Sequence, residues 1–327
     1  MKPNRNPCAP ALAIAASLVL CPGIASAQGW PTKQPIKVIV PLPPATTTDS
    51  IGRLVMEEVG RQLGQAMVVE NRPGASTTLG TNQVAKAEPD GYTLGVVSSS
   101  LTVTPHTFAN LAFNPETDLA PVAILGNMAN VLVVNSGRPF KSAKDLVDEA
   151  KKNPGKLNYA SIGPGSAVHL TAERFRLSAD FQAVHVPFKG TAEALTEVVA
   201  DRIDFTHMPV LSVVPFVQDG KLRALAVSTA KRVASLPDVP TSEEVGYKDS
   251  GYDLWIGVIL PGKTPQAIVE RLHGEIMKAL DKPDLAKKLA DLGVDQMRLS
   301  PVEFGAMIKR EIRANAAVVK AAGIKSN

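Results

Sequence analysis

The chain has 327 residues, with 35 Lys and Arg against 31 Asp and Glu and a formal net charge of +4. Charges balanced this evenly argue against a nucleic-acid or membrane-surface binder, because such proteins concentrate an excess of basic residues. Both cysteines, Cys8 and Cys21, lie in the first 27 residues, so the remaining sequence has no thiol for a disulfide or a metal site.

The first 27 residues predict a secretory signal peptide. Lys2 and Arg5 precede an apolar run over residues 9–20, and Ala25-Ser-Ala27 is a typical cleavage motif. We therefore expect export to the periplasm and a mature chain with 33 basic and 31 acidic residues once Lys2 and Arg5 are removed. A lipid anchor on Cys21 is the alternative, which the bulky Leu20 before it disfavours. The roughly 300 remaining residues suggest two domains.

Strands and helices alternate in the first part of the mature chain. We predict strands at 36–40, 67–70 and 92–97 and helices at 50–63 and near 78–87. This order is typical of βαβ units and a largely parallel sheet.

Two polar loops follow strands of this series. The loop Pro41 to Asp49 holds three threonines and places Asp49 as the expected N-cap of the next helix. The run Ser98-Ser-Ser100 comes at the carboxyl end of a strand, where ligands bind in open α/β sheets. An ordinary strand-to-helix turn and an ordinary polar loop are the alternatives.

A second βαβ series begins after two apolar runs within residues 121–134, which are separated by Gly126-Asn127. Expected helices cover 142–151, a segment opened by Gly163 to Ser166, 192–200 with Thr191 as N-cap, and one ending near Gly220; expected strands cover 157–161, 183–186, 203–206 and 224–228. A strand at 252–260 returns the chain, and helices at 265–281, 283–292 and 301–322 close it. We expect residues 28–130 and 252–327 to form lobe 1 and residues 131–251 to form lobe 2.

The sequence lacks the common catalytic signatures. No serine has glycine at both −2 and +2, and there is neither a phosphate-binding Gly-Lys-Ser/Thr motif nor a His-Glu-x-x-His motif. The five histidines have no metal-ligand spacing, so we expect no metal and no cofactor.

One arrangement recurs in place of these signatures. Asp49, Ser166 and Thr191 each follow a strand and a Pro- or Gly-containing loop, and each opens a helix. Free N–H groups and hydroxyls at three helix starts suit a carboxylate, because each hydrogen bond to a charged acceptor contributes about 1.5 to 3 kcal/mol. The alternative is three unrelated helix caps.

The order of motifs resembles the Bug family of periplasmic solute receptors, the binding proteins of tripartite tricarboxylate transporters. Nine stretches in collinear order carry the resemblance: Trp30–Ile36, Pro43-Pro44 with Asp49, Val69–Gly74, Ala87–Thr93, Gly155–Ala160, Gly165–Leu170, His185–Gly190, Gly220–Ala226 and Leu236–Thr241. Together they span almost the whole mature chain.

The resemblance implies a two-lobed, type II-like periplasmic binding protein fold of the α/β class, with the ligand in the cleft between the lobes. Carried over by position, the first-lobe contacts are Pro43, Pro44, Ala45, Thr46, Asp49, Ser98, Ser99 and Ser100. The second-lobe contacts are Ser161, Gly163, Ser166, Ala167, Lys189, Gly190 and Thr191.

Two departures from the family pattern bear on the ligand. Ala45-Thr46 stand where the family loop usually has Gly-Gly, which adds bulk where the backbone would approach a ligand. Met208, beside His207, stands where many relatives have an aspartate that can hold an ammonium group. We count His207 and Met208 among the candidate site residues and expect a carboxylate without an amine.

We therefore expect a monomeric, non-enzymatic receptor that captures a small organic carboxylate and delivers it to membrane transporter subunits. Two alternatives stay open. One is an accessory sensor that passes ligand occupancy to a membrane signalling protein, and the other is a secreted hydrolase.

Overall fold

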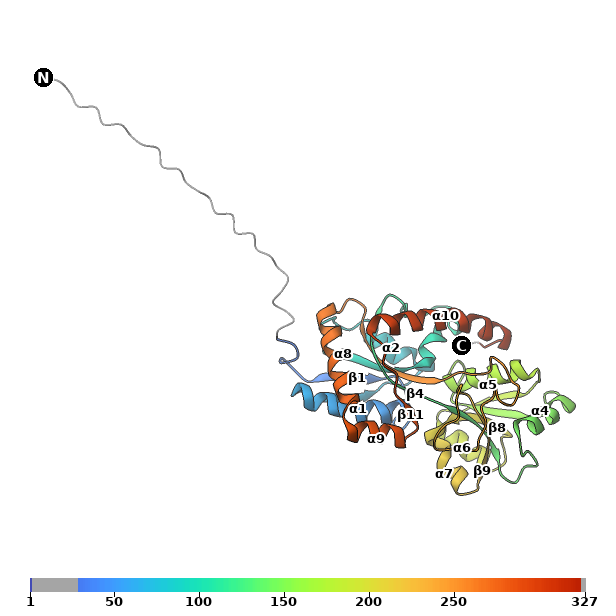
Figure 1. Ribbon diagram of the computed structural model, residues 1–327. Helices are drawn as coiled ribbons and strands as arrows, with labels where there is room; N and C mark the ends of the chain where they lie inside the picture. Colours follow the sequence, from blue (N-terminus) through green and yellow to red (C-terminus); the bar gives the residue numbers. More distant parts are fainter. Residues whose placement is uncertain (2–28, 325–327) are drawn as a thin grey trace.

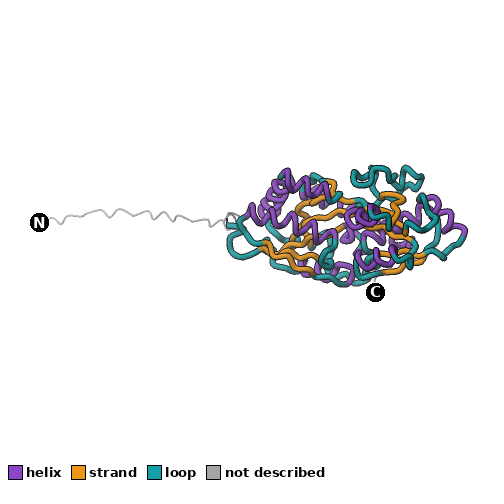
Figure 2. The backbone as a smooth tube through the Cα atoms, turned by 90° about the horizontal axis from the view of Figure 1, so that it is seen from below, coloured by secondary structure: helices purple, strands orange, loops and turns teal. Residues whose placement is uncertain are grey.

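The computed structural model describes residue 1 and residues 29–324 and contains two β-sheets with helices against their faces (Figures 1 and 2). The predicted signal peptide lies outside the described residues, apart from Met1. The first sheet has the order β11-β4-β10-β3-β1-β2 and the second has the order β7-β6-β8-β5-β9. The chain is thus a mixed α/β protein with two sheets, as the sequence predicted.

The strands of the first sheet are β1 (Ile36–Val40), β2 (Met67–Asn71), β3 (Thr93–Ser98), β4 (Leu119–Met128), β10 (Leu254–Pro261) and β11 (Val294–Asp295). Its helices are α1 (Thr47–Leu63), η1 (Ala75–Thr77), α2 (Thr78–Ala85), η2 (Ser99–Thr102), α3 (Thr104–Thr107), α8 (Gln266–Leu280), α9 (Pro283–Asp291) and α10 (Pro301–Ala322).

The strands of the second sheet are β5 (Asn130–Asn135), β6 (Asn158–Ser161), β7 (Val184–Pro187), β8 (Phe205–Pro209) and β9 (Leu222–Val227). The helices between them are α4 (Ala143–Lys152), α5 (Ala167–Ala179), α6 (Thr191–Val199) and α7 (Val210–Gln218).

The strands of the first βαβ series are parallel, as expected, but each complete sheet is mixed. Strand β1 pairs in parallel with β2 and β3, but β10 is antiparallel to both β3 and β4. In the second sheet β5 is likewise antiparallel to β8 and β9. Strands β5 and β10 are the first strands that the chain forms after it crosses into each sheet, so they enter from the side opposite to the βαβ strands.

The change of sheet falls at one residue. Strand β4 ends at Met128 and β5 begins at Asn130, so Ala129 alone separates them. The break expected at Gly126-Asn127 lies inside β4, where the register with β10 shifts and Gly126 has a φ of 158°. A bulge of this kind bends the strand without ending it.

Strand β1 shows why the apolar runs are continuous rather than alternating. Ile36, Val38 and Val40 belong to the core beneath α1 and α8, whereas Ile39 belongs to the core beneath α2 and α10. Successive side chains of a strand point to opposite faces, and helices cover both faces here. All four side chains are fully buried.

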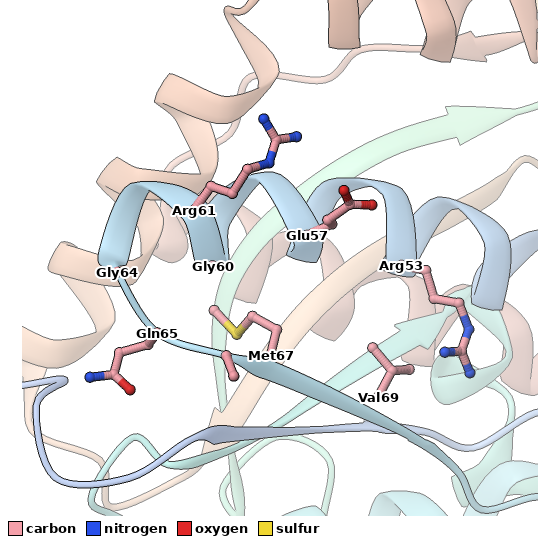
Figure 3. A pocket seen from close by; sticks show the side chains of 9 residues that line it. Arg53, Glu57, Gly60, Arg61, Gly64, Gln65, Met67 and Val69 are labelled. Carbon is pink, nitrogen blue, oxygen red and sulfur yellow. The ribbon is translucent and has the colours of Figure 1, made fainter.

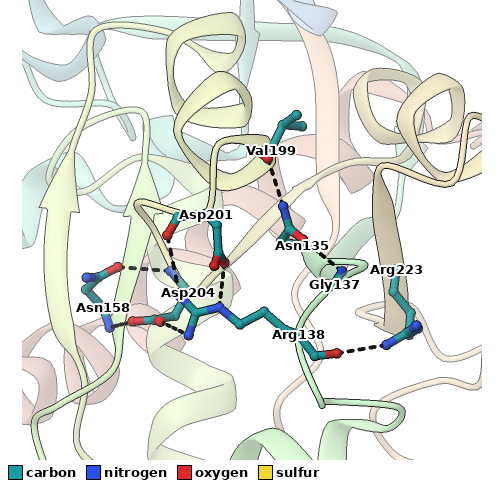
Figure 4. Close-up of polar contacts among 8 residues, drawn as sticks. All are labelled: Asn135, Gly137, Arg138, Asn158, Val199, Asp201, Asp204 and Arg223. Atoms are coloured by element: carbon teal, nitrogen blue, oxygen red, sulfur yellow. Dashed lines mark hydrogen bonds and ion pairs between the residues drawn. The ribbon is translucent and has the colours of Figure 1, made fainter.

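Polar side chains connect the ends of three strands in the second sheet (Figure 4). Arg138, which follows β5, pairs with Asp204 at 2.6 Å and also contacts Asp201. The Asp204 carboxylate accepts from the backbone N of Asn158, whose side chain accepts in return from the backbone N of Asp204. This network fixes the alignment of β5, β6 and β8 at the end of the sheet where these residues lie.

A buried polar network joins α5 to α10. Arg174 of α5 donates to Asn315 Oδ1 of α10 at 3.0 Å and lies 5.0 Å from the centre of the Tyr252 ring. The Tyr252 hydroxyl donates to the backbone oxygen of Ser99 at 3.1 Å, and Asn315 donates to Thr102 at 2.8 Å. Helix η2 is therefore held by α10 through Asn315 and by α5 through Tyr252.

Candidate functional site

The N-terminus of α1 is capped by Thr46. Its hydroxyl accepts from the backbone N of Asp49 at 3.4 Å and donates to the backbone oxygen of Pro43 at 3.0 Å. Asp49, predicted as the N-cap, is instead the third helical residue, and the helix begins three residues before the predicted start. The helix is capped three residues before the predicted position because Thr46 has the extended backbone and the hydroxyl that an N-cap needs.

The Asp49 carboxylate braces the loop. It accepts from the backbone N of Ala45 at 2.9 Å, and from Arg53 and Asn71 at 2.9 Å each. Asp49 is only 3% exposed, and three protein donors occupy its two oxygens. It holds the conformation of Ala45, whose φ of 61° is a left-handed value that favours glycine.

Of the three consecutive serines, Ser98 ends β3, and Ser99 and Ser100 begin the short 3₁₀ helix η2; all three are buried. The Ser100 hydroxyl accepts from the backbone N of Ala167, the first residue of α5, at 2.9 Å. Ser76 makes a second contact between the two parts of the chain, donating to the backbone oxygen of Pro164 at 2.8 Å. The loops of the first sheet and the start of α5 thus touch directly.

Ser166 is the N-cap of α5, as predicted, but its hydroxyl proton is already donated to a backbone oxygen. The hydroxyl accepts from the backbone N of His169 at 3.3 Å and donates to the backbone oxygen of Gly163 at 2.8 Å. Thr191 was predicted as the N-cap of α6, but Gly190 occupies that position and Thr191 is the first helical residue. Gly190 has the extended backbone of an N-cap, a position where glycine is among the accepted residues.

The N-termini of α1, α5 and α6 meet at one small cavity. It has a volume of about 30 Å³, which is room for one or two water molecules, and its lining residues are Leu42, Thr46, Thr47, Thr48, Ser98, Ser100, Ile162, Ala167, Val168, Thr191, Pro209 and Leu254. We call it the inner cavity.

A larger outer cavity of about 380 Å³ shares Leu42, Ser100 and Ile162 with the inner one. Its other lining residues are Pro41, Pro43, Pro73, Gly74, Ser76, Thr77, Gly163, Ser166 and Lys189. The proline side chains make this cavity mainly apolar, and Lys189 is the single charged residue of its lining.

The Thr47 hydroxyl is the most informative group at the inner cavity. Thr47 is 6% exposed, and its Oγ1 has no hydrogen-bond partner among the residues that the structure describes. A buried hydroxyl without a partner costs about 1 to 3 kcal/mol, so such groups usually await a ligand or a water. The helix dipole of α1 adds a positive potential at the same place.

The candidate residues divide into two groups. Those that line a cavity are Pro43, Thr46, Ser98, Ser100, Gly163, Ser166, Ala167, Lys189 and Thr191. Those outside both linings are Pro44, Ala45, Asp49, Ser99, Ser161, Gly190, His207 and Met208. Contact of any of them with a ligand stays a prediction.

His207 and Met208 are buried in β8, at 1% and 0% exposure, and their neighbour Pro209 lines the inner cavity instead. Sequence reasoning missed Thr47 and Thr48 as lining residues, although the run of three threonines signalled polar groups at this helix start. It also missed the segment from Pro73 to Thr77 as part of a cavity lining, because the sequence there indicated only a turn.

A larger and more open cavity lies elsewhere, between the C-terminal half of α1 and β2 (Figure 3). It measures about 690 Å³, and Figure 3 shows Met67 directed toward α1. Arg53 and Arg61 border it, but they pair with Asp49 and Glu58. Because the helix end there presents carbonyl oxygens, it does not favour an anion.

Ser161 and His185 lie close together behind the α5 loop. The distance from Ser161 Oγ to His185 Nε2 is 2.6 Å, which is typical of a nucleophile and its base. However, Ser161 is fully buried and lines neither cavity, and its hydroxyl also accepts from the backbone N of Gly163. This pair therefore gives no access to a substrate.

The described residues contain no group of three or more His, Cys, Asp or Glu that could hold a metal ion. Of the helices between residues 29 and 324, none combines the length and the apolar character that a bilayer span requires.

Comparison with known proteins identifies the family. The model of the tripartite tricarboxylate transporter family receptor matches residues 51–324. This chain belongs to that receptor family. Protein BugT of Bordetella pertussis is 33% identical over 321 residues, covering 96% of this chain and 98% of its own.

Solved structures of the same kind superpose closely on this receptor. The periplasmic binding protein BugD has a TM-score of 0.83 at 29% identity, covering 90% of this chain and 100% of BugD. A Rhodopseudomonas palustris protein solved with adipate has a TM-score of 0.84 at 31% identity, covering 90% and 99%. MatC of Rhodopseudomonas palustris, solved with malate, has a TM-score of 0.80 at 31% identity, covering 88% and 99%. The fold is that of periplasmic binding proteins.

Proposed function

We propose that this receptor captures a small organic carboxylate in the periplasm and presents it to the membrane subunits of a tripartite tricarboxylate-type transporter. The observation that carries the proposal is the meeting of three helix N-termini, from α1, α5 and α6, at the inner cavity. The Thr47 hydroxyl lies beside it and has no partner among the described residues. Backbone N–H groups at helix starts bind carboxylates without a paired cation. The similar proteins solved with adipate and malate support the same ligand class.

The linings also favour a ligand without an amine. Neither cavity is lined by an aspartate or glutamate, so an ammonium group would find no counter-charge there. One carboxylate would occupy the inner cavity, and the apolar body of the ligand would contact Pro41, Pro43 and Pro73 of the outer cavity. Lys189, at the same cavity, suits a second carboxylate. This argument replaces the one from His207 and Met208, which line neither cavity.

We further propose that residues 28–130 with 252–327 and residues 131–251 act as two lobes that close around the ligand. The change of sheet at Ala129 and the return of the chain at β10 are consistent with this division. The contacts Ser76–Pro164 and Ser100–Ala167 would then belong to the closed state, and a ligand shifts the population toward that state by binding it more tightly. The predicted signal peptide would deliver the receptor to the periplasm.

A thermal-shift screen followed by calorimetry tests the function. The series contains adipate, malate, succinate, citrate, benzoate, aspartate and glutamate. A ligand at 100 times its Kd stabilises the folded protein by about 2.7 kcal/mol, which the screen detects as a raised Tm. Binding of an amine-free carboxylate supports the proposal, whereas tight binding of glutamate or aspartate alone would contradict the amine-free ligand.

The alternatives have separate readouts. Proton NMR of the ligand after incubation with the receptor shows whether it is recovered unchanged, and turnover would favour the hydrolase. Co-purification of the receptor with a membrane kinase, and with no transporter subunit, would favour the sensor.

A further inference from the structure

A continuous chain of hydrogen bonds lies beneath the loop that opens α5. Ser161 Oγ is 2.6 Å from His185 Nε2 and accepts from the backbone N of Gly163 at 3.1 Å. Ser166 donates to Gly163 O at 2.8 Å and accepts from the backbone N of His169 at 3.3 Å. The backbone N of Gly165 donates to His169 Nδ1 at 3.1 Å. We call these six residues the histidine circuit.

The backbone groups dictate where the protons of the circuit lie. A backbone N–H can only donate and a backbone oxygen can only accept. Ser166 therefore gives its proton to Gly163 O. Ser161 has its own proton to place, and His185 Nε2 at 2.6 Å is closer than Gly163 O at 3.2 Å. The shorter distance favours the arrangement in which Ser161 donates and His185 Nε2 is the terminal acceptor without a proton.

The two imidazole rings stack, with centroids 3.8 Å apart and planes 10° from parallel. Tyr159 stacks on His185 at 5.1 Å, and its hydroxyl donates to Glu173. The carboxylate of Glu173 also pairs with Arg176, so the charged groups nearest to the stack are occupied by one another. Burial lowers the pKa of His169 to about 3 and lowers the pKa of His185 below its ordinary value.

We propose that His185 is a positioning residue for the carboxylate site at the inner cavity, which we call the anion seat. Its unprotonated Nε2 orients Ser161, and through Gly163 and Ser166 it holds the first turn of α5 toward the inner cavity. The ligand side of this proposal rests on the proposed function. The geometry of the circuit itself does not depend on any ligand.

Protonation would reverse the circuit. A proton taken from solvent at His185 Nε2 turns that nitrogen into a donor to Ser161 Oγ. The Ser161 proton then turns to Gly163 O, whose two lone pairs let it accept from Ser161 and Ser166 at once. Sharing this oxygen weakens the hydrogen bond from Ser166 to Gly163 O, which holds the Ser166 hydroxyl at the cap of α5. The seat is therefore competent when His185 is neutral and weakened when it is charged.

NMR of the ligand-free secreted receptor, labelled with ¹⁵N and titrated from pH 8 to pH 4.5, tests the circuit. We expect His185 Nε2 to be unprotonated at pH 8 and the His169 amide to shift with the midpoint of His185. Ser161→Ala keeps the ring stack but breaks the circuit, so the His169 amide should lose most of this response. A protonated Nε2 at pH 8, or an equal response in Ser161→Ala, would overturn the proposal.

Calorimetry with adipate adds the functional readout. Loss of one hydrogen bond is worth about 0.5 to 1.5 kcal/mol, so the affinity of His185→Phe at pH 7.5 should be about 2- to 12-fold below that of the wild type. Phenylalanine keeps a ring for the stack, and the variant should lose the additional fall in affinity that the wild type shows at pH 5. An unchanged pH profile in His185→Phe would overturn the role of His185.

The two arms separate the two proposals. If no carboxylate of the series binds the wild type at any pH, the proposed function fails, and the NMR titration still decides whether the circuit exists. If carboxylates bind and the circuit is absent, only the positioning role of His185 fails.

Discussion

Replacing Thr47 by valine should move stability and affinity in opposite directions. The Thr47 hydroxyl is buried and has no partner among the described residues. Valine has nearly the same shape, so Thr47→Val removes the unsatisfied group and leaves the packing intact. Relief of an unpartnered buried hydroxyl should stabilise the ligand-free receptor by about 1 to 3 kcal/mol. An N1 residue contributes little to the helix cap, which Thr46 already provides.

The same change should weaken ligand binding. A hydroxyl that donates to a carboxylate contributes about 1.5 to 3 kcal/mol, which corresponds to a loss of affinity of roughly 13- to 160-fold. Urea unfolding without ligand measures the first effect, and calorimetry with the ligand that the screen identifies measures the second. A variant that is both more stable and a poorer binder would identify Thr47 as a functional group held at a cost in stability.

Thr206→Val is the matched control. Thr206 is also fully buried, but its hydroxyl donates to the backbone oxygen of Ala160 at 2.9 Å and it lines neither cavity. This variant should lose about 1 kcal/mol of stability and keep its affinity. If Thr47→Val loses stability as Thr206→Val does, or if its affinity is unchanged, the reasoning about the inner cavity is refuted.

Four further predictions concern stability. Ala45→Gly should stabilise the receptor by up to about 1 kcal/mol in urea unfolding. The left-handed conformation strains a residue with Cβ, and this strain is larger than the extra chain entropy that glycine loses on folding. A loss of stability would contradict this reasoning. Ser166→Ala should lower stability by about 1 kcal/mol, because a helix cap is removed, and a fully unchanged urea midpoint would show that the cap contributes nothing. Arg174→Met removes the contacts of α5 with Tyr252 and Asn315 and should lower the free energy of unfolding by about 2 to 3 kcal/mol. Because α5 and α10 belong to different proposed lobes, the variant should also enlarge the ligand-free receptor in small-angle scattering. Equal scattering profiles would exclude a role of Arg174 in holding the lobes together. Burial lowers the pKa of His207 to about 3, so the unfolded chain takes up a proton below about pH 6.5 that the folded chain refuses, and stability falls with pH. The stability of His207→Leu relative to the wild type should therefore rise by about 2 to 3 kcal/mol between pH 7 and pH 4.5, and a constant difference would be evidence against a neutral His207.

Local patterns located most elements to within a few residues. The four apolar residues of β1 and the helix starts after Pro- or Gly-containing loops could be recognised because they depend on neighbours in sequence. The cap positions were less certain. Thr46, Asp49, Gly190 and Thr191 all have side chains or conformational freedom suited to helix starts, and the choice between them depends on backbone angles that the surrounding fold imposes.

The sequence by itself determined the family, the two βαβ series and the collection of hydroxyls and helix starts that suits an anion. Only the tertiary structure decided which of those groups remain free. Ser166, Thr46 and Asp49 turned out to be occupied by neighbouring backbone groups, whereas Thr47 has no partner within residues 29–324. Whether a hydroxyl is available depends on what lies within about 3 Å of it, and residues distant in sequence supply much of that surrounding, as the Ser100 contact with Ala167 illustrates.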